Sequence, residues 1–382
     1  MRTARRPSVP EWDGTFRERF PGLADRVYLN SNSTGLVPSE VEEVLHGYWR
    51  TLSSWQDDVW DSFFATTQDY ATAVAGFIGA PPGSVVTDLN LSTLLARVAS
   101  SFTYEAPRDR IVVTDLEFPT VTALWHGFSK YGARIDVVAG RGPDFDEDAL
   151  VGAVGERTKL VCVSHGSYST GAMLDLAPIV EQAHAVGAYV VVDAYQTVGT
   201  VPLDVTALGV DFVLGGAQKW LCGMSTAFLY VRPDLLETLQ PAVTGWLAKE
   251  APFSSGLASE WFGDARRFRA GTPLPLGPMM SAPGLRLLTD IGVERIRAHS
   301  LACTNRIIER ADQLGLKVLT PRPAERRGGV VCLALPGGQQ VVESLVADGL
   351  VCSWRGSLRV GPHFYNSMDE VDRFMDALRE RL

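Results

Sequence analysis

The stretch DAYQTVGTVPLDVTALGVDFVLGGAQK, residues 193–219, follows the apolar run AYVVV at 188–192 and contains a second apolar run, VDFVL, at 210–214. Both runs are short, rich in β-branched residues and bounded by turn-forming residues, which is typical of buried parallel strands. Asp193 ends the first run, and Lys219 follows the second after Gly-Gly-Ala-Gln. Ligands of open parallel sheets bind at the carboxyl ends of the strands, so the sequence predicts that Asp193 and Lys219 lie at one binding edge.

Each of these two residues, taken alone, has an ordinary structural interpretation. Asp193 could cap a turn, and Lys219 could be a solvated loop lysine. An ionised pair at a strand edge would be costly, however, unless it served a ligand. An aspartate that can pair with a pyridinium nitrogen and a lysine that can form a Schiff base are the two groups that a pyridoxal phosphate site requires.

The composition excludes several function classes. The chain has 382 residues, enough for one large or two modest domains, and a net charge of −9 with no basic run beyond the N-terminus, which disfavours nucleic acid. The N-terminal arginines are not followed by an apolar stretch, and no apolar run is long enough to span a bilayer, so we expect neither a secretory signal nor a membrane partner. Five scattered cysteines indicate reduced thiols and a cytoplasmic location. The histidines show no metal-ligand spacing, so no metal site is predicted.

Strand-like and helix-like segments alternate from residue 27 to 231, which predicts an α/β fold with a mostly parallel sheet wrapped by helices. The strand at 226–231 returns without an intervening helix and is expected to be antiparallel. Beyond residue 291 the pattern changes to a small α+β unit that begins with two helices over roughly 292–315. We predict an N-terminal arm at 1–27, a large cofactor-binding domain at 28–285 and a small C-terminal domain at 286–382.

Several further polar or aromatic residues have both a structural and a functional interpretation. Asn90, Leu91 and Ser92 start a helix, which is either an ordinary cap or a phosphate site. Phe118 ends a strand beside a proline, as a core residue or a ring that stacks on a planar ligand. His165 follows another strand, where we favour a structural role over an acid–base role.

Two later segments add candidates. Arg359 lies within an apolar strand, so it is either paired internally or directed at a ligand carboxylate. Residues 240–268 have little periodicity, and long irregular segments in compact domains are often functional. Trp246, Trp261, Arg266, Arg267 and Arg269 are the candidates there.

The chain resembles the class V aminotransferase group of fold type I pyridoxal phosphate enzymes, and within it the kynureninase-like branch. The resemblance extends from Tyr28 to the C-terminus, and the order and spacing of its motifs make it specific. They are YLNSNSTG at 28–35, EFPT at 117–120, VVVDAYQ at 190–196, GGAQKW at 215–220, GW at 245–246, GTP at 271–273 and LRVGPHFYN at 358–366.

The resemblance implies a role for each matching residue. Lys219 would hold pyridoxal 5′-phosphate as a Schiff base, and Asp193 would keep its ring nitrogen protonated. Arg359 would bind the α-carboxylate of an amino-acid substrate, with Asn32 nearby. The other cofactor contacts would be Phe118 on the ring, Gln196 and Ser164 beside it, Asn90, Leu91, Ser92, Gln218 and Thr272 around the phosphate, and Trp246 beside the phosphate or substrate. Thr272 would come from the partner subunit of a homodimer with a shared active site.

This sequence departs from the kynureninase pattern at four positions. Kynureninases usually have His where Lys249 stands, Tyr at Gln218, His at Gln196 and Asp at Val121. The first three departures touch cofactor or substrate contacts, so they argue against hydrolysis of kynurenine. A desulfurase would need an exposed nucleophilic cysteine, and Cys352 lies in an apolar strand instead.

Three functions follow from these residues. The leading one is a kynureninase-like or other side-chain-cleaving lyase, in which Lys219 takes the Cα proton of an L-amino acid. The second is transamination. The third is a non-catalytic relative that keeps only the scaffold, against which the presence of Asp193, Lys219 and Arg359 together argues. Lys249, Arg267, Arg269 and Arg355 hint at an acidic or polar substrate side chain, or are surface charges.

Overall fold

The computed structural model describes residues 14–55, 59–251, 253 and 259–382. Its main element is a seven-stranded sheet in the order β2-β8-β7-β6-β5-β3-β4. The strands are β2 (Val85–Asp88), β3 (Arg110–Thr114), β4 (Arg134–Val138), β5 (Thr158–Ser164), β6 (Tyr189–Asp193), β7 (Phe212–Gly216) and β8 (Ala227–Val231). The five strands from β7 to β4 are parallel, and β8 is antiparallel to both of its neighbours. The predicted α/β fold and the antiparallel return strand are confirmed.

Side-chain alternation along the strands builds a core on each face of this sheet. Val190 and Val192 of β6 belong to one core, and Val191 belongs to the other. All three are fully buried, as expected for a parallel strand that is covered on both faces.

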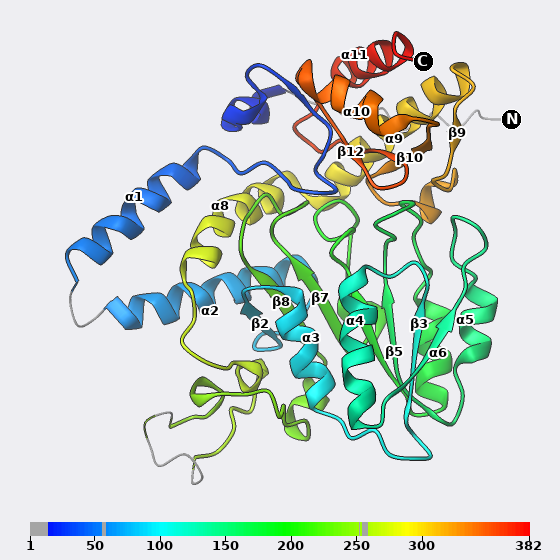
Figure 1. Cartoon of the computed structure of the whole chain (residues 1–382). Helices are drawn as coiled ribbons and strands as arrows, with labels where there is room; N and C mark the ends of the chain where they lie inside the picture. The colour runs from blue at the N-terminus through cyan, green and yellow to red at the C-terminus, as the bar shows by residue number, and fades with distance from the viewer. Residues whose placement is uncertain (1–13, 56–58, 252, 254–258) are drawn as a thin grey trace, which may run out of the picture.

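Helices cover both faces (Figure 1). One core is closed by α3 (Leu91–Ser100) and α4 (Pro119–Phe128), and the other by α2 (Val59–Phe77), α5 (Glu147–Ala153), α6 (Ala177–Ala185) and α8 (Leu276–Ile291). The remaining helices of the described chain before residue 292 are α1 (Glu40–Ser53), which contacts α8, and the single turn α7 (Val205–Leu208). No helix within the described ranges is both long enough and apolar enough to cross a membrane.

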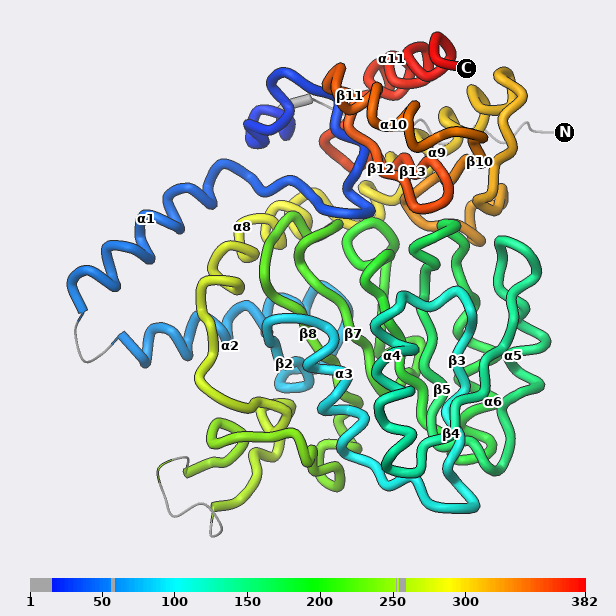
Figure 2. The backbone as a smooth tube through the Cα atoms, viewed as in Figure 1, coloured from blue at the N-terminus to red at the C-terminus, as the bar shows by residue number. Residues whose placement is uncertain are grey.

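The C-terminal part forms a second sheet, in the order β12-β13-β10-β9, which lies over one end of the large sheet (Figure 2). Its strands are β9 (Lys317–Val318), β10 (Val331–Ala334), β12 (Ser353–Trp354) and β13 (Leu358–Val360), all antiparallel to their neighbours. The helices packed with it are α9 (Val293–Gln313), α10 (Gly338–Ala347) and α11 (Met368–Arg379). The division into domains at residues 27 and 285 remains a proposal; α8 runs across the second boundary.

The prediction of two helices over 292–315 is wrong, because α9 is one continuous helix. The segment between Val293 and Gln313 contains neither glycine nor proline, and Ile296, Cys303 and Ile307 keep one face apolar along its whole length. A sequence without a helix breaker gives no physical reason for an interruption there.

The chain before the large sheet is tied to the C-terminal part. β1 (Val27–Tyr28) pairs in parallel with β11 (Leu350–Val351), and Asn30 forms a bridge with Gly361. Further back, Phe20 is buried against Phe364 and Tyr365. Of the predicted arm, residues 1–13 lie outside the described residues. Short 3₁₀ helices cover Gly14–Arg19, Pro21–Leu23, Ser129–Tyr131, Pro233–Glu237, Trp246–Ala248, Ala265–Phe268 and Ala324–Arg326.

Gly35 fixes the turn that carries Lys219. The backbone N–H of Gly35 donates a hydrogen bond to the Gln218 carbonyl oxygen at 2.7 Å. A Cβ atom at position 35 would overlap the carbonyl oxygen of Lys219. Only glycine therefore allows the two backbones to approach this closely.

We expect Gly35→Ala to lower the free energy of unfolding by about 1–3 kcal/mol, because the added methyl group must push two backbone segments apart. Gly127→Ala is the matched control, since a Cβ at Gly127 in α4 meets nothing within 4 Å. Chemical denaturation of the two full-length variants measures the difference. Equal stability of the two variants would show that the Gly35 contact is not tight.

Candidate active site

A cavity of about 370 Å³ lies at the carboxyl ends of β3, β5, β6 and β7. It brings together every residue to which the resemblance assigned a role, except Trp246 and Thr272. Those that line it are Asn32, Asn90, Leu91, Ser92, Phe118, Ser164, Asp193, Gln196, Gln218, Lys219 and Arg359. The parallel strands explain this grouping, because their carboxyl ends share one edge of the sheet.

Asp193 is the last residue of β6 and is 8% exposed. Its Oδ1 accepts a hydrogen bond from the Tyr195 backbone N–H at 2.8 Å. Burial raises the pKa of the Asp193 carboxyl, while that hydrogen bond and the nearby Lys219 act in the opposite direction. A buried carboxylate in this position favours a cationic partner in the cavity.

Lys219 follows β7 on a tight turn. Its Nζ lies 4.7 Å from the centre of the Tyr195 ring and 5.8 Å from that of Phe118. Burial lowers the pKa of Lys219 to about 8, with Asp193 opposing the shift and Arg359 adding to it. Its amine is therefore far more often neutral near physiological pH than that of an ordinary lysine, as a nucleophile or base requires.

Arg359 lies on β13 and reaches the cavity from the C-terminal sheet, with 4% exposure. With its amide oxygen turned towards the guanidinium, Asn32 accepts hydrogen bonds from Nη2 and Nε of Arg359 at 2.8 and 3.2 Å. Burial is the main cause that lowers the pKa of Arg359, and Arg355 contributes by repulsion. A buried arginine held by a neutral amide keeps its charge available for an anionic ligand.

The first turn of α3 supplies hydrogen-bond donors to the same cavity. Asn90 caps the helix, and its Oδ1 accepts a hydrogen bond from the Thr93 N–H at 3.0 Å. Helix geometry leaves the N–H groups of Leu91 and Ser92 without intrahelical acceptors. Such a helix start, with the positive end of its dipole, suits a phosphate group.

Ser164 forms a hydrogen bond with Glu117, a buried glutamate to which the sequence analysis gave no role. The Ser164 hydroxyl donates to Oε2 of Glu117 at 2.6 Å, and the Thr114 hydroxyl donates to Oε1 at 2.7 Å. Burial raises the pKa of Glu117 to about 7; its hydrogen bonds oppose the shift, and Asp193 adds to it. The only signal in the sequence was the place of Glu117 in the EFPT motif.

Other lining residues were also missed as site residues. They are Ser33, Thr34, Thr120, Gly166, Tyr168 and Tyr195, while Arg355 was noted only as a charge. Tyr168 meets the Phe118 ring edge to face, with 5.2 Å between ring centres. His165 does not line the cavity; its Nδ1 contacts the Thr197 hydroxyl at 3.0 Å, and burial lowers its pKa to about 4. That placement fits the structural role favoured for it.

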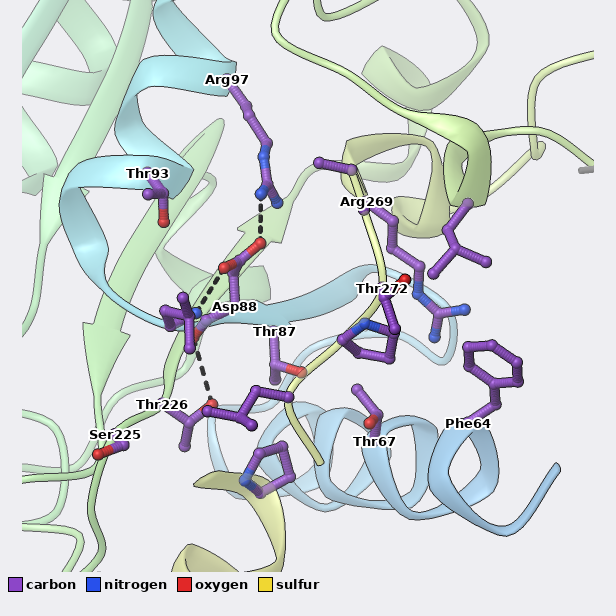
Figure 3. A pocket seen from close by; sticks show the side chains of 17 residues that line it. Phe64, Thr67, Thr87, Asp88, Thr93, Arg97, Ser225, Thr226, Arg269 and Thr272 are labelled. Carbon is purple, nitrogen blue, oxygen red and sulfur yellow. Dashed lines mark hydrogen bonds and ion pairs between the residues drawn. The ribbon is translucent and has the colours of Figure 1, made fainter. Parts of the chain in front are cut away.

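Thr272 and Trp246 lie elsewhere in this protomer. Thr272 lines a second cavity of about 290 Å³, together with Thr93, Arg97 and Arg269 (Figure 3). The Trp246 ring packs against Phe253, with 5.2 Å between ring centres. The roles assigned to both residues, and the contribution of Thr272 from a partner subunit, stay predictions.

The other cations noted in the sequence also have partners outside the Lys219 cavity. Nζ of Lys249 lies 3.9 Å from the centre of a Trp261 ring. Arg267 donates to the carbonyl oxygens of Phe262 and Leu239, each at 2.9 Å, and Arg269 donates to the Gln68 side chain at 2.7 Å.

Comparisons with known proteins agree with this geometry. A family model described as "Aminotransferase class-V" matches residues 27–374. The uncharacterized aminotransferase YcbU of Bacillus subtilis is 30% identical, over 95% of this chain and 96% of the relative. A kynureninase of Burkholderia pseudomallei is 28% identical, over 95% of this chain and 91% of the relative.

A solved structure of a similar protein has the same fold as this chain. The apo cysteine desulfurase from Thermococcus onnurineus NA1 superposes with a TM-score of 0.86 and 25% identity, covering 100% of this chain and 99% of that one. Because the family model spans nearly the whole sequence, the chain belongs to the class V aminotransferases, which are fold type I enzymes that depend on pyridoxal phosphate.

Proposed function

We propose that this enzyme acts on an L-amino acid, uses Lys219 to remove the Cα proton, and then breaks a bond from Cβ of the side chain. The observation that carries the proposal is the single cavity that holds the Lys219 amine, the Asp193 carboxylate and the Arg359 guanidinium. These are the groups needed to hold the cofactor, to keep its ring cationic and to bind an α-carboxylate.

An unpaired atom supports the fit of the cofactor. Gln196 donates from Nε2 to the Asn32 carbonyl oxygen at 3.1 Å, and its own Oε1 is buried without a hydrogen-bond partner among the described residues. A buried acceptor left in this state is costly unless a ligand supplies a donor. Pyridoxal phosphate carries a ring hydroxyl that can do so.

When bound, pyridoxal phosphate supplies an electron-poor ring that takes up the electron pair left at Cα. The chain's own residues do the rest. Asp193 stabilises positive charge on the ring side of the cavity. Arg359, held by Asn32, orients the substrate through its carboxylate. Lys219, with its lowered pKa, accepts the proton from Cα and returns one later in the reaction.

The cysteines argue against a persulfide-forming desulfurase. Cys162, Cys222, Cys303, Cys332 and Cys352 are all buried, and none lines the Lys219 cavity. Burial raises the pKa of the Cys352 thiol to about 12, which leaves almost no thiolate for nucleophilic attack. Buried free thiols also support the proposed cytoplasmic location.

Transamination is the second candidate, and the 30% identity to an aminotransferase favours it. It uses the same three residues and the same proton transfer from Cα. The two reactions diverge after that step, because a lyase breaks a bond from Cβ, whereas a transaminase keeps the side chain and removes the amino group. The cavity residues described above serve both. A kynureninase-like activity is the narrower form of the first candidate.

One test of this function concerns the amine of Lys219 in cofactor-free protein. Only the neutral amine attacks an aldehyde, so the rate of pyridoxal phosphate incorporation should rise with pH and level off above about 8. The measurement is the growth of the visible absorbance band of the bound cofactor. Nα-acetyl-lysine, whose side-chain amine has an ordinary pKa of about 10.4, is measured in parallel. It separates the effect of pH on the aldehyde itself from the effect of pH on Lys219. Levelling only near that value would contradict a perturbed Lys219.

A second test separates the two reactions. L-amino acids, including kynurenine and cysteine S-conjugates, are added to the holoenzyme while the visible band and the products are followed. We expect the band to change transiently and return while product accumulates over many turnovers, because a lyase leaves the cofactor unchanged. Lasting loss of the band that a 2-oxo acid reverses would replace the lyase with a transaminase. No response to any amino acid would refute both.

We also propose that the enzyme is a homodimer with a shared active site. Leu45, Trp49 and Leu52 recur at helical spacing on α1 and are 41%, 66% and 44% exposed, and Trp55 and Trp60 continue the patch. Soluble monomers rarely leave such contiguous apolar surface uncovered. The absence of Thr272 and Trp246 from the Lys219 cavity of their own protomer agrees with a contribution across the interface.

Trp49→Asp should convert the dimer into a monomer, because a charge replaces the most exposed ring of the α1 face. Light scattering during size-exclusion chromatography measures the mass, and circular dichroism checks the fold. Tyr131→Asp, at a side chain that is 62% exposed outside this face, is the control. A wild-type monomer, or a Trp49→Asp variant that stays dimeric, would remove the support that this face gives to the dimer.

A further inference from the structure

The turn between β12 and β13 places a second arginine in the Lys219 cavity. Trp354 pairs with Leu358 across this hairpin, which leaves residues 355–357 as its tip. The Arg355 N–H donates to the Ser357 carbonyl oxygen at 3.1 Å, and Gly356 has a φ of 76° that suits glycine. Arg355 therefore sits on a hydrogen-bonded turn, and the same hairpin carries Arg359.

The described charged residues that line the cavity have an excess of cations. The cations are Lys219, Arg355 and Arg359, and the anion is Asp193. Asp193 interacts with Lys219, and Arg359 is held by Asn32. Arg355 remains without a carboxylate within ion-pair distance among the described residues.

The Arg355 side chain makes few contacts with the described part of the protein. Its side chain is exposed, and its Nη1 donates a long hydrogen bond of 3.4 Å to the Trp354 carbonyl oxygen. Arg355 also disfavours the charged form of Arg359 by repulsion. An anionic group bound at Arg355 would offset that repulsion and give Arg355 a partner.

Arg355 also differs from three other cations noted in the sequence. Lys249, Arg267 and Arg269 each have an aromatic, carbonyl or amide partner and lie outside this cavity. Of these four residues, only Arg355 faces the place where a substrate would bind.

We propose that Arg355 binds a side-chain anion of the substrate, so that the preferred substrates are L-amino acids with a second acidic group, such as a carboxylate or sulfinate. The α-carboxylate goes to Arg359, as the proposed function requires, and the side-chain anion goes to Arg355 at the exposed side of the cavity. This inference rests on the proposed function and adds the substrate class to it.

The test compares ligands of equal size and different charge. L-glutamate with L-glutamine, and L-aspartate with L-asparagine, are titrated into the holoenzyme, and Kd is read from the change in the visible band. L-cysteine sulfinate is added as a further acidic ligand. We expect wild type to bind each acid about tenfold more tightly than its amide, because a hydrogen bond between charged groups replaces one to a neutral group.

Arg355→Gln should abolish this preference by weakening the acids about tenfold, while the amides change less than about twofold. Arg355→Lys should restore part of it, and Lys130→Gln, at an exposed cation outside the cavity, should behave as wild type. The preference should also shrink at high salt, because Arg355 is exposed. Cofactor affinity of Arg355→Gln, measured separately, should stay unchanged.

Three results would overturn the inference. Wild type could bind the amides as tightly as the acids. Arg355→Gln could weaken acids and amides equally, which would place Arg355 at the α-carboxylate. Arg355→Gln could lose affinity for pyridoxal phosphate, which would assign the residue to the cofactor. Failure of the proposed function looks different, since no amino acid of any charge would then perturb the band.

Discussion

The active site depends on a buried carboxylate facing a buried amine. Asp193 ends β6, and Lys219 follows the adjacent parallel strand β7. Burial disfavours the charged form of each residue, while each residue shifts the pKa of the other towards its charged form. Such a pair is only marginally favourable in an apolar setting. The surrounding structure must therefore hold it in place, which the fully buried valines of β6 and the close contact of Gly35 with the Lys219 turn achieve.

Glu117 is a second buried carboxylate, and it interacts with Asp193. Glu117 lies behind Ser164, whose neighbour in the β5–β6 ladder is Asp193. Burial is the main cause that raises the pKa of both carboxyls, and repulsion from Asp193 adds to the shift of Glu117. The Ser164 and Thr114 hydroxyls are donors to Glu117, so they stabilise its ionised form and leave the Ser164 oxygen as an acceptor towards the cavity. A cationic ligand beside Asp193 would ease the repulsion.

The sequence predicted the parts of this site that depend on chain-local patterns. Asp193 and Lys219 could be placed because β-branched runs and turn residues mark strands and their ends. The resemblance then located residues such as Phe118 and Gln218 through motif positions. Glu117 was missed because its role depends on its burial and on a hydrogen bond to Ser164, which lies 47 residues away in the sequence. Arg355 could not be separated from Lys249, Arg267 and Arg269, because all four cations have surface-like sequence surroundings. Only packing shows which one faces the cavity.

The proposed carboxylate-binding residues Arg359 and Asn32 meet at the contact between the two sheets. Asn32 follows β1, which pairs with β11 of the C-terminal part, and Asn30 forms a bridge with Gly361. A Cβ at Gly361 would overlap the Asn32 amide, so glycine there lets the strand that carries Arg359 approach. The Asn32 carbonyl oxygen also accepts from Gln196 beside Asp193. One residue thus links the cofactor side of the cavity to the arginine, and any movement of the C-terminal sheet relative to the large sheet would change both contacts together.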